Sequence, residues 1–157
     1  MIPYDIVETE FGPQNFLAAP KQMMNVAEIT EYFMKWFPAL AEEAKRQQLH
    51  VNGQPSGFYS LWDEATHTTE VQAVMPVQDP ALENGEFTVI GLPATRVLRA
   101  SFYGPYEGTS AAHAAIDKFA RDNSYTITGI PWETYVTDPA EEPDPEGWLT
   151  EVYYPVA

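Results

Sequence analysis

The clearest alternation of hydrophobic and polar positions lies at residues 131–138, where aromatic, β-branched and polar side chains follow one another. Such residues favour strands, in which successive side chains point to opposite faces. Trp132 and Thr134 therefore share one face of a predicted strand, and Glu133 and Tyr135 share the other. Burying a carboxylate without a partner is costly. Two interpretations remain open: a functional carboxylate, or a side chain that points to solvent or pairs with an arginine.

A first helix is predicted after Asn25, which forms a capping-box pattern with Glu28. Apolar residues then recur at helical spacing. They are Ile29, Tyr32, Phe33, Trp36, Phe37, Leu40 and Ala44. Pro38 lies inside this pattern, and proline removes a backbone donor and crowds the preceding turn. We therefore expect a kink or a break at Pro38.

The rest of the chain predicts strands separated by turns, with one further helix. Residues 5–19 are predicted to be extended, with an interruption at Gly12-Pro13. The second helix is expected to begin at a cap formed by Thr109 or Ser110. The other strands are expected at residues 58–62, 68–77, 95–103, 131–138 and 148–156, with a long acidic loop at 138–147.

This order is strand, helix, strand, strand, and it occurs twice. Thr69-Glu70-Val71 and Thr150-Glu151-Val152 open the two return strands and form a faint sequence repeat. A unit of this kind leaves its sheet half covered, so two units can complete one core. We expect one α+β domain over residues 1–157. Its halves span about residues 5–77 and 94–157, and residues 78–93 connect them.

Composition and charge narrow the function classes. The chain has 157 residues, 23 acidic against 8 basic side chains, and a formal net charge of −15. This charge argues against nucleic acid as a partner, since a phosphate backbone requires clustered Lys and Arg. It suits cations or a basic protein partner, although an acidic surface often serves solubility alone. No apolar run is long enough to span a bilayer and no signal peptide is visible, so we expect a cytoplasmic location.

Candidate catalytic and metal-binding residues are sparse. With no cysteine in the sequence, thiol catalysis, disulfides and Cys-based metal sites are excluded. His50, His67 and His113 have no metal-ligand spacing. We interpret His113 as an ordinary surface or edge histidine on the second helix, and His67 as a solvent-facing loop residue. No cofactor and no metal site are predicted.

With this layout established, the chain resembles the GyrI-like effector-binding domain, which occurs fused to AraC-type and MerR-type regulators and also as a stand-alone protein. The resemblance covers nearly the whole chain, and its motifs are short but keep their order and spacing. The matching segments are Ile29 to Leu40, Gly57-Phe58-Tyr59 with the strand to Val77, Leu92-Pro93-Ala94, Tyr103-Gly104-Pro105-Tyr106-Glu107, Pro131-Trp132-Glu133-Thr134-Tyr135, Asp138-Pro139, and Leu149 to Val156.

The resemblance implies a duplicated βαββ fold with pseudo-twofold symmetry, one main helix per half, and antiparallel sheets that form a concave pocket. In drug-binding members, an acidic residue at the position of Glu133 meets cationic, aromatic ligands. The ligand-binding residues implied here are Glu133, Tyr135, Tyr106, Tyr59, Trp62, Trp36 and Phe33. The chemistry agrees, since aromatic faces attract delocalised cations and a desolvated carboxylate favours a charged ligand.

Three functions remain open. The first is a small-molecule binding protein that senses or sequesters an apolar, cationic or aromatic compound at Glu133. The second is a hydrolase of reactive electrophilic molecules, in which Glu133 activates water and Tyr59 or Tyr135 donates a hydrogen bond to the developing negative charge. The third is a protein-interaction module similar to the gyrase inhibitors of the family. The balance favours binding over catalysis.

Overall fold

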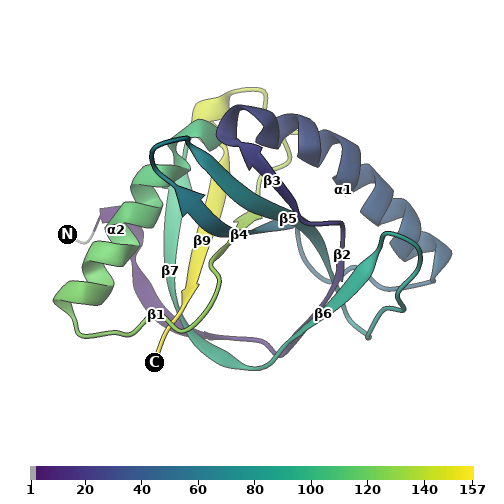
Figure 1. The fold of residues 1–157 in the computed structure, drawn as a ribbon, viewed down its shortest axis with the longest axis horizontal. Helices are drawn as coiled ribbons and strands as arrows, with labels where there is room; N and C mark the ends of the chain where they lie inside the picture. The colour runs from purple at the N-terminus through teal and green to yellow at the C-terminus, as the bar shows by residue number, and fades with distance from the viewer. Residues whose placement is uncertain (1–2) are drawn as a thin grey trace. The chain divides into compact units, whose positions relative to one another are not determined.

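Four antiparallel strands and one helix form what we call the terminal unit, which combines the N-terminal residues up to Phe11 with Thr95–Ala157. The computed structural model describes residues 3–157. The sheet order is β1-β7-β9-β8, and α2 packs on β7 and β9 (Figure 1). The elements are η1 (Pro3–Asp5), β1 (Val7–Phe11), β7 (Thr95–Tyr103), η3 (Tyr106–Gly108), α2 (Thr109–Asp122), β8 (Trp132–Tyr135), η4 (Pro145–Gly147) and β9 (Leu149–Pro155).

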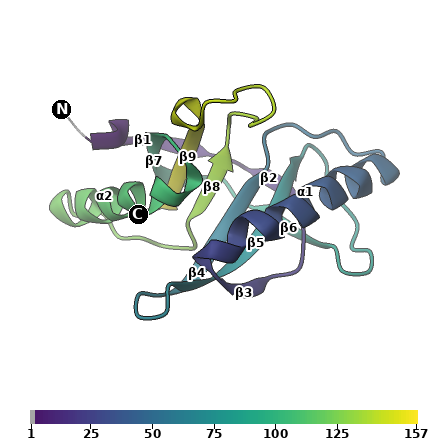
Figure 2. The ribbon, with the colours of Figure 1, turned by 90° about the horizontal axis from the view of Figure 1, so that it is seen from above.

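The middle unit, Gly12–Ala94, contains five antiparallel strands and one helix. The strands run in the order β4-β5-β2-β6, and β3 also pairs with β5. Helix α1 lies along β5 (Figure 2). The elements are β2 (Gln14–Ala18), β3 (Gln22–Asn25), η2 (Val26–Glu28), α1 (Ile29–Arg46), β4 (Ser56–Asp63), β5 (Thr68–Val77) and β6 (Thr88–Leu92).

The predicted α+β class with one main helix per half is confirmed. Each unit contains a strand, a helix and two further strands in chain order: β3-α1-β4-β5 in the middle unit and β7-α2-β8-β9 in the terminal unit. Both return strands lie within the predicted ranges, and the capping box of Asn25 and Glu28 is present at the start of η2.

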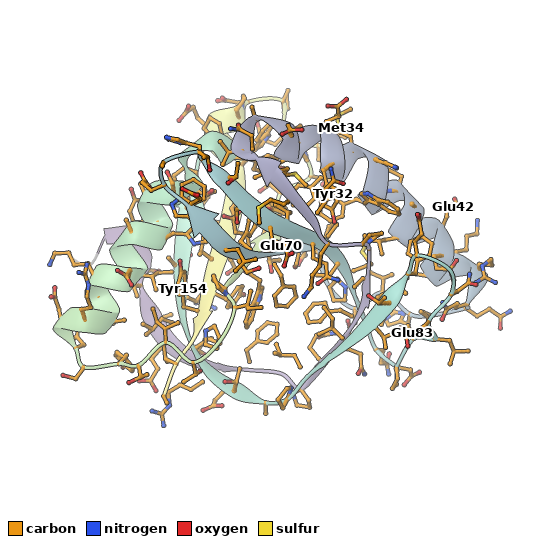
Figure 3. The ribbon with its side chains drawn as sticks, in the orientation of Figure 1. Tyr32, Met34, Glu42, Glu70, Glu83 and Tyr154 are labelled. Atoms are coloured by element: carbon orange, nitrogen blue, oxygen red, sulfur yellow. The ribbon has the colours of Figure 1, made fainter. Side chains whose placement is uncertain are left out.

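Of the kink or break that we expected at Pro38, the break is wrong, and so is the expected side-chain cap of the second helix. Helix α1 runs from Ile29 to Arg46 with Pro38 inside it, so the chain does not break there. Pro38 is exposed on the outer side of the helix, where water can solvate the carbonyl that loses its partner. Packing of the inner side holds the helix together: Figure 3 shows Tyr32 on that side and Met34, which is 72% exposed, on the outer side.

The second error concerns the start of α2. Neither Thr109 nor Ser110 caps the helix, because the N-cap is Gly108 and makes no side-chain cap bond. The Thr109 hydroxyl instead donates to the carbonyl of Tyr106, within the turn before the helix. A Cβ at Gly108 would lie 2.6 Å from Cζ of Phe102, so a larger residue at this position would force that ring to move.

The order of the strands in space also differs from the order along the chain. β1 pairs with β7, so the first strand belongs with residues 95–157 rather than with the segment that follows it. β6, in the predicted connector, pairs with β2. β3, around Met23 and Met24, had no strand prediction, because two methionines carry no alternating pattern.

Candidate functional site

Glu133 faces helix α2 from strand β8. Across the sheet it lies opposite Val152 of β9, which in turn lies opposite Ala100 of β7. Directly paired residues share a face, and both neighbours belong to the core beneath α2. The Glu133 residue is only 4% exposed. The interpretation that it points to solvent is therefore wrong.

The partner of Glu133 is a histidine. His113 on α2 places Nε2 2.6 Å from Oε2 of Glu133, and the Tyr135 hydroxyl donates to Oε1 at 3.0 Å. Among residues 3–157, no Lys or Arg forms an ion pair with this carboxylate, so the predicted alternative of an arginine partner is also wrong.

His113 is not the ordinary surface or edge histidine that we predicted. Its side chain is 20% exposed, and its second ring nitrogen, Nδ1, lies 2.7 Å from the hydroxyl of Tyr154 on β9. Figure 3 shows Tyr154 among the strands next to α2. The imidazole therefore bridges a phenol and a carboxylate that come from two neighbouring strands.

The Tyr154 hydroxyl keeps its proton at physiological pH. Burial, and then the negative charges of Asp117 and Glu133, raise the pKa of Tyr154 far above its ordinary value of 10.0. A protonated phenol can donate to Nδ1 of a neutral imidazole, whose Nε2–H then donates to Glu133. In this tautomer every polar group in the series Tyr154, His113, Glu133 has a partner.

Aromatic rings continue from this cluster. The ring of Tyr106, in η3, lies 5.2 Å from that of Tyr135 and 5.0 Å from that of Trp148 between centroids. Tyr106 is half-buried, and burial followed by the charge of Asp138 raises its pKa. A second carboxylate thus acts on the aromatic group. We call Glu133, His113, Tyr135, Tyr154, Tyr106 and Trp148 the Glu133 cluster.

The opposite face of the same sheet has a different character. Trp132 stacks on Tyr153 at 5.3 Å between centroids, and Phe11 packs edge-on against Trp132 at 5.0 Å. Burial and the neighbouring Glu151 raise the pKa of Tyr153 to about 12. Trp132 and Glu133 therefore lie on opposite faces, as the strand pattern predicts, and both faces of β8 are buried.

The structure brings together three of the seven predicted ligand-binding residues, Glu133, Tyr135 and Tyr106. The other four belong to the middle unit. Phe33 and Trp36 are buried on α1, Tyr59 is half-buried on β4, and Trp62 is 49% exposed and donates from Nε1 to Glu64 at 2.7 Å. Their part in ligand binding stays a prediction.

Sequence reasoning missed His113, Tyr154 and Trp148. Tyr154 carried a usable signal, because it is two residues after Val152 and so shares the face of Glu133's neighbour. No sequence signal marked His113, since its role depends on which strand the helix packs against. Within the described residues, no group of three or more His, Asp or Glu side chains could hold a metal ion, and no helix there is long and apolar enough to cross a membrane.

Comparison with known proteins gives a family and a fold. The profile of the GyrI-like small molecule binding domain matches residues 19–157. The EcmrR C-terminal domain superposes with a TM-score of 0.83 at 19% identity, covering 98% of this chain and 97% of that domain. In the EcmrR–DNA complex the TM-score is 0.84 at 20% identity over 97% of this chain, which spans only 57% of that regulator.

Two further structures share the fold at lower identity. A hydrolase from Listeria innocua gives a TM-score of 0.67 at 12% identity, covering 99% of this chain and 93% of that one. SAV2435 bound to tetraphenylphosphonium gives 0.59 at 11% identity, covering 98% of this chain and 94% of that one. No curated protein sequence matches the chain. At these identities the structural likeness establishes the fold alone.

Proposed function

The chain belongs to the GyrI-like small molecule binding family, and from this premise we propose that it binds an apolar, aromatic cation at the Glu133 cluster. In this role the protein senses or sequesters its ligand. The observation that carries the proposal is the carboxylate of Glu133, which is buried in the terminal unit without a Lys or Arg partner among the described residues. A desolvated negative charge of this kind favours a cation over a neutral compound of the same shape.

The rings beside Glu133 support an aromatic ligand. Tyr135, Tyr106 and Trp148 form a continuous series of ring contacts that starts at the hydroxyl bonded to the carboxylate. Aromatic faces attract cations whose charge is spread over a large apolar body. The charge of Asp138 near Tyr106 adds to the negative potential. The neighbour that holds tetraphenylphosphonium, a cation built of aryl rings, suggests a first probe.

The test compares tetraphenylphosphonium with neutral triphenylphosphine oxide on wild type and Glu133→Gln. A ligand that binds only the native state raises the melting temperature. We expect the substitution to weaken the cation by about 1–3 kcal/mol, the range for loss of a charged partner, and to leave the neutral compound nearly unchanged. Glu146→Gln is the control, because it removes the same charge from an exposed position in η4 of the same unit. Equal losses for both compounds would contradict the proposal.

The Tyr154–His113–Glu133 series supports a second candidate, hydrolysis of a reactive electrophile. Glu133 would accept a proton from a water molecule while the water oxygen bonds to the electrophilic carbon and the bond from that carbon to its leaving atom breaks, and the protonated Glu133 would then return the proton to the leaving atom. Tyr135 would donate a hydrogen bond to that atom as negative charge develops. The hydrolase among the structural neighbours makes this reaction worth testing.

Turnover separates the two candidates. Styrene oxide is a suitable electrophilic probe, and its diol product can be quantified by chromatography. More than one diol per protein molecule, lost in Glu133→Gln, would establish catalysis. If diol forms no faster than it does without protein, and tetraphenylphosphonium still binds, the result would support binding and argue against catalysis of this reaction.

A further inference from the structure

We propose that Asn84, in the loop before β6, is a site of spontaneous deamidation, and that its conversion to aspartate or isoaspartate detaches this loop from helix α1. The inference concerns the middle unit and is independent of the proposed ligand. Its basis is a juxtaposition of two features. An exposed asparagine directly precedes a glycine, and its carboxamide donates a hydrogen bond to the buried carboxylate of Glu43.

The chemistry follows from the glycine after the asparagine. The backbone nitrogen of Gly85 attacks Cγ of Asn84, and a C–N bond forms while the side-chain amide takes up the proton of that nitrogen and leaves as ammonia. Water then opens the cyclic imide at either carbonyl, which gives aspartate or isoaspartate. A side chain after the asparagine would shield the attacking nitrogen, and glycine has none. Asparagine is accordingly one of the thermolabile residues that proteins of hyperthermophiles contain less often.

The turn around Gly85 leaves room for this step. Gly85 and Glu86 form a two-residue turn, which is closed by backbone hydrogen bonds of 3.1 and 3.0 Å between Asn84 and Phe87. Gly85 has a φ of 60°, and no atom beyond its chain neighbours lies within 4 Å of the point where a Cβ would be. Asn84 and Gly85 are both exposed. The glycine nitrogen is therefore accessible to the carboxamide carbon.

The chain has a second Asn-Gly pair, Asn52-Gly53, whose surroundings restrict it more. Oδ1 of Asn52 accepts from Nε2 of Gln14 at 3.0 Å, and its backbone N–H donates to the carbonyl of Pro76 at 3.2 Å. A Cβ at Gly53 would lie 3.0 Å from Cγ of Pro76, so this glycine packs against a rigid ring. Its nitrogen has less freedom to approach the carboxamide. Asn84 should therefore convert faster than Asn52.

The carboxamide of Asn84 is one of the groups that hold the loop on α1. Oε2 of Glu43 accepts from Nδ2 of Asn84 at 3.2 Å and from Nε2 of Gln47 at 2.7 Å. The Gln47 side chain also bonds to the backbone N–H and carbonyl of Leu82, each at 2.9 Å. Figure 3 labels Glu83 on this loop and Glu42 on the helix beside it. The loop is thus fastened to one turn of α1 by two adjacent polar residues of the helix.

Deamidation reverses the sign of the contact with Glu43. The Glu43 residue is 6% exposed, and its pKa is about 2 because of its hydrogen bonds, that of Arg46 foremost. It is therefore ionised wherever the reaction proceeds. Aspartate at position 84 replaces a donor by a second negative charge, and Arg46 already pairs with Glu43 through both carboxylate oxygens. Two like charges in a desolvated place repel each other, so we expect the loop to move away from the helix.

The ring of Phe87 provides a signal of that movement. It packs edge-on against Trp36 of α1 at 6.1 Å between centroids, and Trp36 is only 8% exposed. Isoaspartate adds a methylene group to the main chain inside the turn, so the pairing of residues 84 and 87 cannot be kept. Detachment of the loop then exposes the indole to water, which shifts its fluorescence emission to longer wavelength.

The experiment incubates the full chain at mildly alkaline pH, and peptide mapping by mass spectrometry follows the replacement of NH2 by OH at each asparagine. We expect Asn84 to convert several times faster than Asn52, and the difference to disappear in urea, where both pairs are unfolded. The variant Asn84→Asp should lower the melting temperature by about 2–4 °C and shift the emission. Asn52→Asp is the matched control and should change both little, because that side chain is exposed.

A double-mutant cycle tests the repulsion itself. In the Glu43→Gln background, Asn84→Asp should lower the melting temperature much less, since the repulsion requires both charges. An equal loss in both backgrounds would overturn the assigned cause. Conversion of Asn52 as fast as Asn84 in the folded protein would overturn the site. If Asn84→Asp does not fold, the incubated wild type carries the measurement, because it loses ammonia after folding. Complete conversion at Asn84 with unchanged emission and melting temperature would overturn the detachment.

Discussion

The two units share the same order of strands and helix, but equivalent positions in them hold side chains of different chemistry. Each helix follows a three-residue 3-10 turn. Tyr59 lies opposite the valine of Thr69-Glu70-Val71, just as Glu133 lies opposite the valine of Thr150-Glu151-Val152. The matching positions thus hold a phenol in the middle unit and a buried carboxylate in the terminal unit. The faint sequence repeat marks real structural equivalence, and the polar chemistry appears in one copy only.

The helices explain how the terminal unit accommodates that chemistry. When each helix is counted from its first residue, three buried residues of one helix occupy the same positions as three buried residues of the other. These are Tyr32, Trp36 and Leu40 on α1, and Ala112, Ile116 and Ala120 on α2.

The buried tyrosine of this layer lies on the helix in the middle unit and on a strand in the terminal unit. In the middle unit Tyr32 reaches from the helix to the backbone of Ala73, whose amide donates to its hydroxyl at 3.0 Å. In the terminal unit the helix has Ala112, and the strand residue that matches Ala73 is Tyr154. The phenol on the strand then meets His113, whose counterpart on α1 is the apolar Phe33. Small residues on one helix therefore leave room for a polar cluster.

The largest expected effect comes from the bulky helix. Trp36→Ala removes a buried indole from α1 and should reduce the free energy of unfolding by about 3–5 kcal/mol, the range for large-to-small changes in a core. Urea denaturation measures the change. Met34→Ala, on the exposed side of the same helix, should cost less than about 0.5 kcal/mol. Similar losses for the two variants would mean that the aromatic side of α1 does not stabilise its unit.

A second prediction compares the two buried glutamates. Glu43 on α1 is bonded to Arg46, Gln47 and Asn84, and these bonds, that of Arg46 foremost, lower its pKa from 4.5 to about 2. Glu43→Gln should cost about 2 kcal/mol at pH 7, as expected for charged hydrogen bonds. Glu133→Gln should change stability by less than about 1 kcal/mol, since it removes a buried charge along with its bonds.

The pH dependence of the Glu43 effect has a definite sign. A carboxyl with a lowered pKa in the folded state contributes its full stability above its unfolded value, near 4.5, and loses it as pH falls toward about 2. The gap between wild type and Glu43→Gln should therefore shrink from pH 5 to pH 2 in urea denaturation. Glu42→Gln, an exposed neighbour, should show no such trend. A constant gap would contradict the role assigned to the charge.

The smallest expected effect concerns the helix starts. Asn25 forms a capping box before α1, whereas α2 begins at Gly108 without a side-chain cap. Asn25→Ala should cost about 1 kcal/mol, and Ser110→Ala should cost close to nothing. Thermal denaturation of the two variants measures this difference. A comparable loss at Ser110 would show that α2 depends on a cap that the hydrogen bonds do not reveal.

Local pattern was sufficient for the return strands and for the face of Glu133. Residues 68–77 were predicted within their limits because turn residues bound a run of β-formers, and strict alternation separated Trp132 from Glu133. The break that we considered at Pro38 is absent because packing of the opposite side of the helix outweighs the missing donor.

Pairings between distant segments could not be read from the sequence. No local sequence pattern indicates that β1 pairs with β7, or that α2 places His113 over Glu133, because both contacts depend on how the elements pack after they form. Alternation placed Tyr135 on the face of Glu133, whereas Tyr106 was named through the resemblance to a family, which supplies tertiary information that alternation lacks. The same resemblance gave no indication of His113.

The pairing of β1 with β7 has a consequence for the order in which the protein can be made. A ribosome releases β1 first, then the whole middle unit, and only afterwards β7. Domains tend to fold as they emerge, so the strands of the middle unit can pair before β7 is available to pair with β1. During that interval the strand is an unprotected edge that other chains could pair with. Glu8 and Glu10 alternate along β1 with Val7, Thr9 and Phe11, and their negative charges disfavour pairing of this edge with other chains.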